Sequence, residues 1–136
     1  MSLDPERYAD LSGFRYALRQ FLAASEAINR AAGVTQQQYQ AMLAIRAWPE
    51  ATMATKDLAE QLLLTHHGAV QLVDRLEKLG FVGRHHSEGD RRVVLLKLSE
   101  TGETVLADLV GLHVAEIRRQ EPQLTWSLSR IRNAAG

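Results

Sequence analysis

The chain has 136 residues, of which 46% are hydrophobic, and its 16 Lys and Arg residues balance its 16 Asp and Glu residues. This length and apolar content suit one compact domain with its own core and leave no room for a separate catalytic domain. The absence of cysteine excludes a disulfide scaffold and a thiolate sensor, and the zero net charge argues against a broad nucleic-acid-binding surface.

No apolar stretch reaches the roughly 18 residues that a membrane span requires. The first residues, 1–6, lack the basic and apolar regions of a signal peptide. We therefore expect a cytoplasmic protein.

Two helices are predicted before residue 50. Asp4 and Pro5 form the pattern of an N-cap followed by proline at the first helical position, so the first helix should cover about residues 5–32 and end at Gly33. Its residues at helical spacing are Leu11, Phe14, Leu18, Phe21, Leu22, Ser25 and Ile28. The capping box formed by Thr35 and Gln38 opens a second helix that Pro49 stops. This second helix carries Tyr39, Met42, Leu43 and Trp48.

A helix, a tight turn and a second helix are predicted next. The first covers residues 57–63 and has Leu58, Ala59 and Leu62 in one buried stripe. Thr65 is a suitable N-cap for the following helix, residues 66–79, which ends at Gly80. Its apolar face consists of Ala69, Leu72, Val73, Leu76 and Leu79.

Two strands, residues 81–86 and 93–98, follow these helices and enclose a turn-rich loop that carries Arg91 and Arg92. A helix-turn-helix followed by such a hairpin is the order of a winged helix-turn-helix, which reads DNA. Between Lys56 and Lys97, basic residues exceed acidic ones by one, and four of the five histidines lie there. We interpret this distribution as a positive electrostatic field focused on this segment of an otherwise neutral chain.

The C-terminal part is predicted to be helical from Ser99 to about Gln120, and Pro122 is expected to begin a final short helix. The apolar positions of these helices include Leu106, Leu109, Leu112, Ile117, Leu124, Leu128 and Ile131. Such terminal helices need a partner surface, so we expect them to pack on a second copy of the chain. The alternative is that they fold back on the core of their own chain.

Residues 58–102 resemble the core of the MarR family of bacterial transcription regulators. The resemblance is carried by Leu58-Ala59, residues 72–77, Gly80, Arg84, Asp90-Arg91-Arg92, Leu96-Lys97-Leu98-Ser99 and Gly102. The fixed distance from the Asp-Arg-Arg motif to the Leu-x-Leu-Ser and glycine is its specific part. It covers about residues 35–110.

The resemblance implies a mainly α fold with a small β-hairpin wing in a single domain, residues 1–136. The winged helix-turn-helix would occupy about residues 35–100, and the helices at 5–32 and 100–134 would form a homodimer. It further implies a transcriptional regulator, a repressor that binds a palindromic operator and is released by a small-molecule effector.

DNA contacts are expected first from the start of the helix at 66–79, which should enter the major groove. The candidates there are Thr65, His66, His67, Gly68 and Gln71. Gln71 suits a bidentate contact to adenine, and either histidine can donate to guanine or to a phosphate. The family commonly has Ser or Thr where this chain has Gly68 and Val70, and Arg in place of Gln71, so direct readout is expected to be weaker or tuned to an unusual site.

Further DNA contacts are expected from arginines. Arg92, with its neighbour Arg91, is the candidate for the minor groove, where narrow A·T-rich DNA concentrates negative potential. By resemblance, Asp90 pairs with an arginine of the wing and fixes the loop. Arg84 is either a phosphate contact or the partner of Asp90, and Arg75 either reaches a phosphate or pairs within its own helix.

An effector site is implied by the resemblance alone. Small aromatic or phenolic effectors would bind in the cleft between the dimerisation helices and the winged domain. The candidates are Tyr16, Arg19, Trp48 and His113, each of which also suits a packing or solvated role.

We expect neither a metal nor a cofactor, and we do not expect the protein to be an enzyme. Adjacent residues of a strand point to opposite faces, so His85 and His86 are poorly placed to share an ion. No catalytic constellation is found in the sequence. Two alternatives to the DNA reader remain: a winged-helix protein–protein interaction module without DNA binding, and a metal-responsive regulator that uses the histidines.

Overall fold

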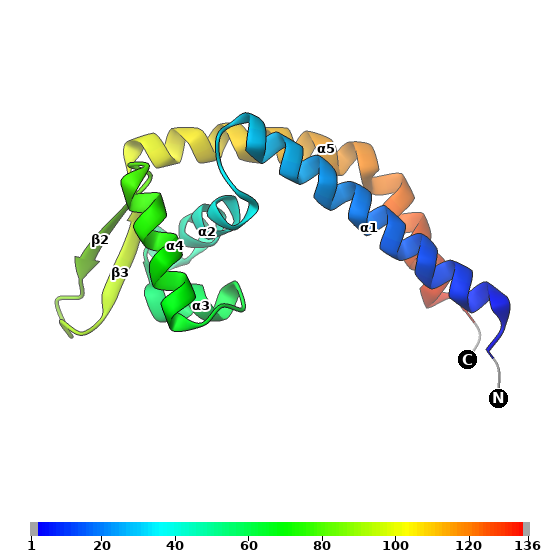
Figure 1. Ribbon diagram of the computed structural model, residues 1–136, viewed down its shortest axis with the longest axis horizontal. Coiled ribbons are helices and arrows are strands. Elements are labelled where there is room, and N and C mark those ends of the chain that lie inside the picture. Colours follow the sequence, from blue (N-terminus) through cyan, green and yellow to red (C-terminus); the bar gives the residue numbers. More distant parts are fainter. Residues whose placement is uncertain (1–2, 135–136) are drawn as a thin grey trace. The chain divides into compact units, whose positions relative to one another are not determined.

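The computed structural model describes residues 3–134, which form a mainly helical chain with a small antiparallel sheet (Figure 1). The predicted fold class, mainly α with a hairpin wing, is confirmed. In chain order the elements are α1 (Pro5–Ala31), α2 (Gln36–Ala47), the 3-10 helix η1 (Pro49–Ala51), β1 (Met53–Ala54), α3 (Thr55–Gln61), α4 (His66–Lys78), β2 (Val82–His86), β3 (Val94–Leu98) and α5 (Glu100–Arg132).

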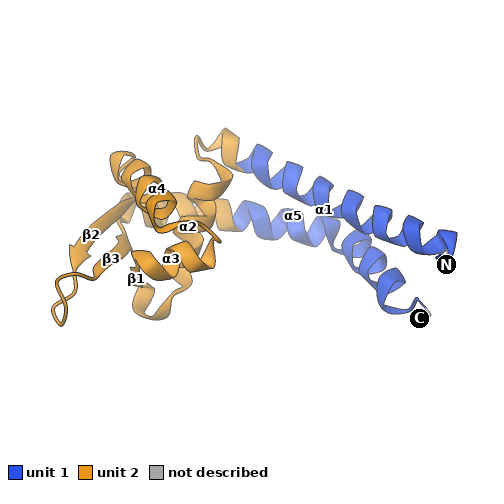
Figure 2. Cartoon of the chain, turned by 60° about the horizontal axis from the view of Figure 1, so that its bottom comes forward, with its two compact units in different colours: residues 1–28, 111–136 blue, residues 29–110 orange. Residues whose placement is uncertain are grey.

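The chain forms two compact units, coloured separately in Figure 2. The first, which we call the helical-pair unit, contains α1 up to Ile28 and α5 from Gly111 onward. The second, the winged unit, contains residues 29–110.

The core of the winged unit comes from α2, α3, α4 and β3. Its fully buried side chains include Met42, Ile45, Leu58, Val73, Leu76 and Leu96. The apolar face predicted for α4 is buried as expected, with one exception. Leu79 is 45% exposed, because it is the C-cap residue beyond the last helical turn.

The sheet has the order β1-β3-β2, and both pairings are antiparallel. Leu96 of the central strand lies opposite Met53 on one side and Arg84 on the other. The sequence did not predict β1. A strand of two residues is too short to show the alternation of apolar and polar residues by which strands are recognised.

Most of the helix ends predicted from capping residues are found in the structure. The capping box of Thr35 and Gln38 is present, and the Thr65 hydroxyl accepts the Gly68 N–H at 3.0 Å. Gly80 has φ +79, the left-handed conformation expected after α4. α3, however, begins and ends two residues earlier than predicted, and Leu63 in the following turn has φ +56.

A close backbone approach fixes the junction between the hairpin and α5. The Ser99 hydroxyl donates to the Gly80 carbonyl at 2.5 Å and accepts the Gly102 N–H at 3.0 Å. A Cβ at residue 102 would lie only 2.1 Å from the Phe81 carbonyl oxygen. Only glycine fits at this position.

In the helical-pair unit, α1 and the C-terminal part of α5 lie side by side. They are joined by an ion pair between Arg130 and Asp10 at 2.9 Å and by a contact of 2.7 Å between Ser25 Oγ and His113 Nε2. The expected N-terminal cap is present, since Asp4 accepts the Glu6 N–H at 3.0 Å. Within residues 3–134, no helix combines the length and the hydropathy needed to cross a bilayer.

The prediction of a separate helix beginning at Pro122 is wrong, because α5 continues through this residue to Arg132. Proline removes one backbone hydrogen bond and crowds the preceding turn, which kinks a helix without necessarily ending it. Figure 2 shows the axis of α5 changing direction in its C-terminal part. The stripe predicted for α1 is also only partly buried, since Leu11 and Leu22 are 56% and 45% exposed.

Candidate nucleic-acid interface

The exposed face of α4 is opposite the one that packs on the core. His67, Gln71 and Arg75 are exposed and recur every four residues, so they form one stripe along the helix. His66 is exposed at the first turn. Within the part of the chain that the structure describes, Arg75 forms no pair within its own helix. Asp74 and Glu77 both bind Arg84 instead.

Gly68 lies in the same first turn, next to the cap. A Cβ there would be 3.2 Å from the Thr65 hydroxyl oxygen and 3.8 Å from the Leu64 Cβ. The first distance is tight, so a side chain at residue 68 would press on the hydroxyl that caps α4. The glycine therefore leaves the helix start well capped even though it lowers helix propensity.

The loop between β2 and β3 is ordered by Asp90. Its carboxylate accepts the backbone N–H of Arg92 at 3.0 Å and the guanidinium Nε and Nη2 at 3.2 and 3.3 Å. The side-chain hydrogen bonds from Arg92, followed by the backbone one, lower the pKa of Asp90. Arg92 itself remains 92% exposed and Arg91 is exposed beside it, so the hairpin presents two guanidinium groups to solvent.

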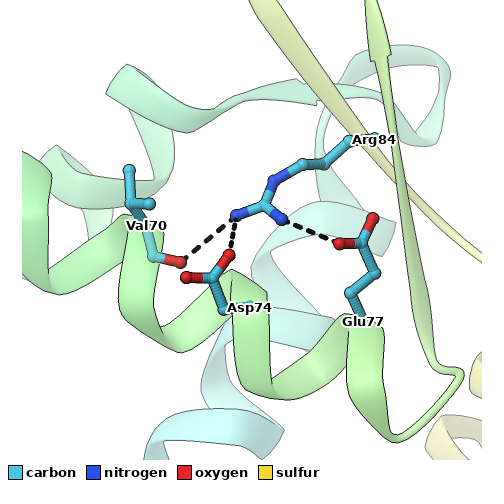
Figure 3. A network of polar contacts seen from close by, with 4 residues as sticks. All are labelled: Val70, Asp74, Glu77 and Arg84. Carbon is cyan, nitrogen blue, oxygen red and sulfur yellow. Dashed lines mark hydrogen bonds and ion pairs between the residues drawn. The ribbon is translucent and has the colours of Figure 1, made fainter.

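Arg84 has partners that the sequence did not indicate. It does not bind Asp90, which pairs with Arg92 instead. Its guanidinium reaches α4, where Nη2 donates to Asp74 at 2.7 Å and to the Val70 carbonyl at 3.3 Å, and Nη1 donates to Glu77 at 2.8 Å (Figure 3). The carboxylates of α4 were the available signal, but nothing in the sequence links them to a residue of the hairpin.

A groove of about 630 Å³ lies between α4 and the wing and extends to the start of α3. It brings together His66, Arg84 and Arg92 of the expected site residues, whereas His67, Gln71 and Arg75 do not line it. Its apolar part is formed by Val70, Val93 and Val94. Lys56 also lines the groove and was missed as a site residue, although a lysine at the start of the first helix of such a motif is a signal for phosphate binding.

The four effector candidates do not all belong to one unit. Tyr16, Arg19 and His113 are in the helical-pair unit, and Trp48 is the half-buried C-cap of α2 in the winged unit. The Tyr16 hydroxyl accepts a hydrogen bond from Gln20, and Arg19 is exposed. His113 is buried against Ser25.

The paired histidines of the wing, His85 and His86, are both exposed. Among residues 3–134, no three or more His, Asp or Glu side chains gather into a group that could hold a metal ion.

Comparison with known proteins identifies this arrangement. Residues 32–93 match the family model described as "MarR family". Over this segment, which is less than half of the chain, the protein is similar to the MarR family. A Bacillus subtilis protein named organic hydroperoxide resistance transcriptional regulator is 36% identical over 69 residues, which are 51% of this chain and 46% of that protein.

Solved MarR structures share the fold. A MarR family transcriptional regulator from Streptomyces coelicolor, AbsC, has a TM-score of 0.80 at 22% identity and covers 88% of this chain and 81% of its own. A second MarR regulator from the same organism, solved in complex with DNA, has a TM-score of 0.79 at 23% identity, with coverages of 97% and 86%.

The chain spans less than half the length of the curated relatives it matches. These relatives are named as transcriptional regulators, a class of proteins that are not enzymes. This agrees with the lack of a catalytic constellation in the sequence.

Proposed function

We propose that this chain is a sequence-specific DNA-binding transcriptional regulator. The observation that carries the proposal is that one compact unit presents both a helix with an exposed polar stripe and a hairpin whose arginine is held by an aspartate. In this proposal His67 and Gln71 face base edges in the major groove, and Arg92 enters the adjacent minor groove. Lys56, His66, Arg75 and Arg91 supply charge toward phosphates.

The functional form in this proposal is a homodimer on a palindromic operator. The apolar side chains that α1 and α5 leave exposed support a second copy as the partner, because a monomer rarely leaves so many large apolar residues in water. Two copies related by a twofold axis would present two α4 helices to successive major grooves, about one helical turn apart. The similarity to the MarR family supports repression and release by a small aromatic or phenolic effector as further parts of the proposal.

Selection of genomic fragments with the purified protein, followed by sequencing, tests this function. We expect an inverted repeat among the selected fragments and an affinity that falls steeply with added salt, since bound arginines and lysines release counterions from DNA. In transcription from a selected fragment, the protein should lower transcript yield, and the effector should restore it. Failure to bind any fragment at low salt would instead favour a protein–protein interaction module.

The wing is tested with Arg92→Ala, which should weaken operator binding by roughly 1–3 kcal/mol and leave the fold intact, because the side chain is exposed. Arg92→Lys is the matched control, since it keeps the charge and removes the guanidinium fork. We expect Arg92→Lys to retain the salt dependence of the wild type and to lose part of the affinity. Unchanged affinity in Arg92→Ala, measured by fluorescence anisotropy, would remove the assigned role.

A further inference from the structure

Arg84 links α4 to the wing hairpin. In the proposed function, these two elements contact the major and the minor groove of DNA. Arg84 lies on β2, only 26% exposed, and all of its three hydrogen bonds described above end on α4 (Figure 3). The accepting residues, Val70, Asp74 and Glu77, follow one another at four and three positions along α4. They therefore share one face of the helix, the face turned toward the wing.

The fork of the guanidinium matches this row of acceptors. One Nη lies between a backbone carbonyl and the Asp74 carboxylate, while the other Nη reaches Glu77 almost one helical turn further on. A planar group with five donors can hold several acceptors at once in a fixed geometry, whereas a lysine ammonium acts as a single point charge. The arrangement thus fixes an orientation as well as bringing opposite charges together.

The base of the hairpin is anchored in the core by Val82, Leu96 and Leu98, but towards its tip the wing has little else to hold it against α4. β2 is an edge strand, paired with β3 alone. Between the hairpin and α4 lies the open groove that Val70, Arg84 and Arg92 line together. The Arg84 side chain crosses this groove from β2 to α4. It therefore links α4, which carries Gln71, to the hairpin whose loop carries Arg92.

The same contacts leave Arg84 unsuited to bind a phosphate. Two carboxylates surround one guanidinium, so the cluster of Arg84, Asp74 and Glu77 carries a net negative charge. Asp74 and Glu77 are 52% and 46% exposed, and both would repel a phosphate brought close to the arginine.

We propose that Arg84 is a positioning residue, which holds the wing at a fixed distance and angle from α4 so that Gln71 and Arg92 reach the major and minor grooves together. This inference rests on the proposed DNA-binding function. It assigns Asp74 and Glu77 to the same role, as the two side chains of α4 that anchor Arg84.

A measurement without DNA tests the link by itself. The chain has no cysteine, so Lys78→Cys and Glu88→Cys introduce two spin labels, one at the end of α4 and one in the wing loop. Diluting the labelled chain with unlabelled chain restricts electron–electron double resonance to distances within one molecule. The distribution should be narrow with Arg84 present and broad in Arg84→Met, whereas Lys97→Met, which removes an exposed charge from the neighbouring strand β3, should leave it narrow. An equally narrow distribution in Arg84→Met would overturn the proposal.

Operator binding tests the consequence. Arg84→Met and Arg84→Lys should both bind a selected operator about tenfold or more weakly, because neither side chain can hold all three acceptors. Their salt dependence should match the wild type, since no phosphate contact is lost. If Arg84 were a phosphate contact, Arg84→Lys would keep most of the affinity and Arg84→Met would lower the salt slope by about 0.9, and either result would contradict the proposal.

Coupling to Arg92 separates positioning from simple loss of stability. With the wing free to move, Arg92→Ala should weaken operator binding little further in the Arg84→Met background, by less than about threefold, whereas a merely destabilised fold would show the full loss of affinity caused by Arg92→Ala.

Asp74→Asn combined with Glu77→Gln gives the reciprocal test. Removing two negative charges should strengthen binding to random DNA but weaken binding to the operator, and stronger binding to both would refute the anchoring role.

The two proposals can fail independently. A chain that binds no DNA at low salt removes the proposed function and leaves the spin-label measurement valid. A chain that binds its operator equally well with Arg84→Met removes the positioning role and leaves the function in place.

Discussion

Arg84 and Arg92 are arginines of the same hairpin, but their side chains differ in exposure and in partner. Arg92 is 92% exposed and shares its guanidinium with one carboxylate of its own loop. Arg84 is 26% exposed and is held by two carboxylates of a helix. An exposed cation with one local partner can still meet a phosphate, whereas one surrounded by acceptors cannot do so without breaking its contacts.

The ion pair of Asp90 and Arg92 gives a pH prediction. Because the pKa of Asp90 is lowered by Arg92, the order that this pair gives the loop is fully present above the pKa of an unperturbed aspartate and is lost as pH falls through the lowered value. In an NMR titration of the carboxyl carbon, Arg92→Ala should raise the pKa of Asp90 toward its ordinary value.

Arg91→Ala is the matched control for this titration. It removes an equal charge from the adjacent residue but none of the hydrogen bonds that the structure gives Asp90. The pKa of Asp90 should move less than in Arg92→Ala. Equal shifts in the two variants would mean that general charge, and not the local bonds, orders the loop.

At the scale of elements, the turn between α3 and α4 contains a residue whose type does not suit its backbone. Leu63 has φ +56 and is 92% exposed, so its side chain gains little from packing while its backbone is in the left-handed region. Leu63→Asn should raise the free energy of unfolding by roughly 0.5–1 kcal/mol, because asparagine tolerates this conformation.

Denaturant unfolding at one fixed protein concentration measures this effect. Leu62→Asn is the control, since Leu62 has φ −96 and is half-buried, and it should be destabilising. A decrease in stability for Leu63→Asn would show that the exposed leucine has a contact in the native protein that offsets the strain.

The junction between the hairpin and α5 requires a glycine at residue 102. Gly102→Ala should destabilise the winged unit by about 2–3 kcal/mol or more, because its Cβ would meet the Phe81 carbonyl at 2.1 Å and backbone must move. Gly111→Ala, on the same helix with nothing within 4 Å of the added Cβ, should instead stabilise by about 1 kcal/mol. Similar melting temperatures for the two variants would contradict the close approach.

Elements with a local signature were predictable from the sequence. The caps at Thr35 and Thr65 and the left-handed Gly80 depend on residues a few positions apart, and each was found where the sequence placed it. β1 is too short to carry a pattern, and the continuation of α5 through Pro122 depends on the packing of the helix as a whole. The partners of Arg84 depend on how the hairpin folds against α4, which no spacing along the chain encodes.

At the scale of the whole molecule, the helical-pair unit exposes a large apolar surface. The large hydrophobic residues exposed on it include Tyr8, Leu11, Tyr16, Leu22, Leu112, Ile117, Trp126, Leu128 and Ile131. Several of them belong to the stripes that the sequence marked as buried. The stripe pattern and the exposure agree if these residues are buried against a second chain, which is the proposed dimer.

The dimer is tested with Leu11→Glu combined with Leu128→Glu. Both side chains are more than half exposed in the single chain, at 56% and 52%, so the fold of one chain should tolerate the change. In a twofold dimer each substitution occurs twice, and each replaces roughly 1.5–3 kcal/mol of apolar burial with a carboxylate to be desolvated. Light scattering at micromolar concentration should therefore report a mass near 15.2 kDa for the variant and twice that mass for the wild type.

Ala107→Glu is the control, because it places the same charge on an exposed position of α5 outside the helical-pair unit, and it should remain dimeric. The monomeric variant should keep the hydrogen-exchange protection of α4 and of the sheet, since the winged unit has its own core. It should bind a single half-site as the wild type does and lose the added affinity for the full inverted repeat, because two recognition helices are then no longer linked. A wild-type chain that scatters as a stable monomer, or a variant that keeps full operator affinity, would overturn both the dimer and the palindromic operator.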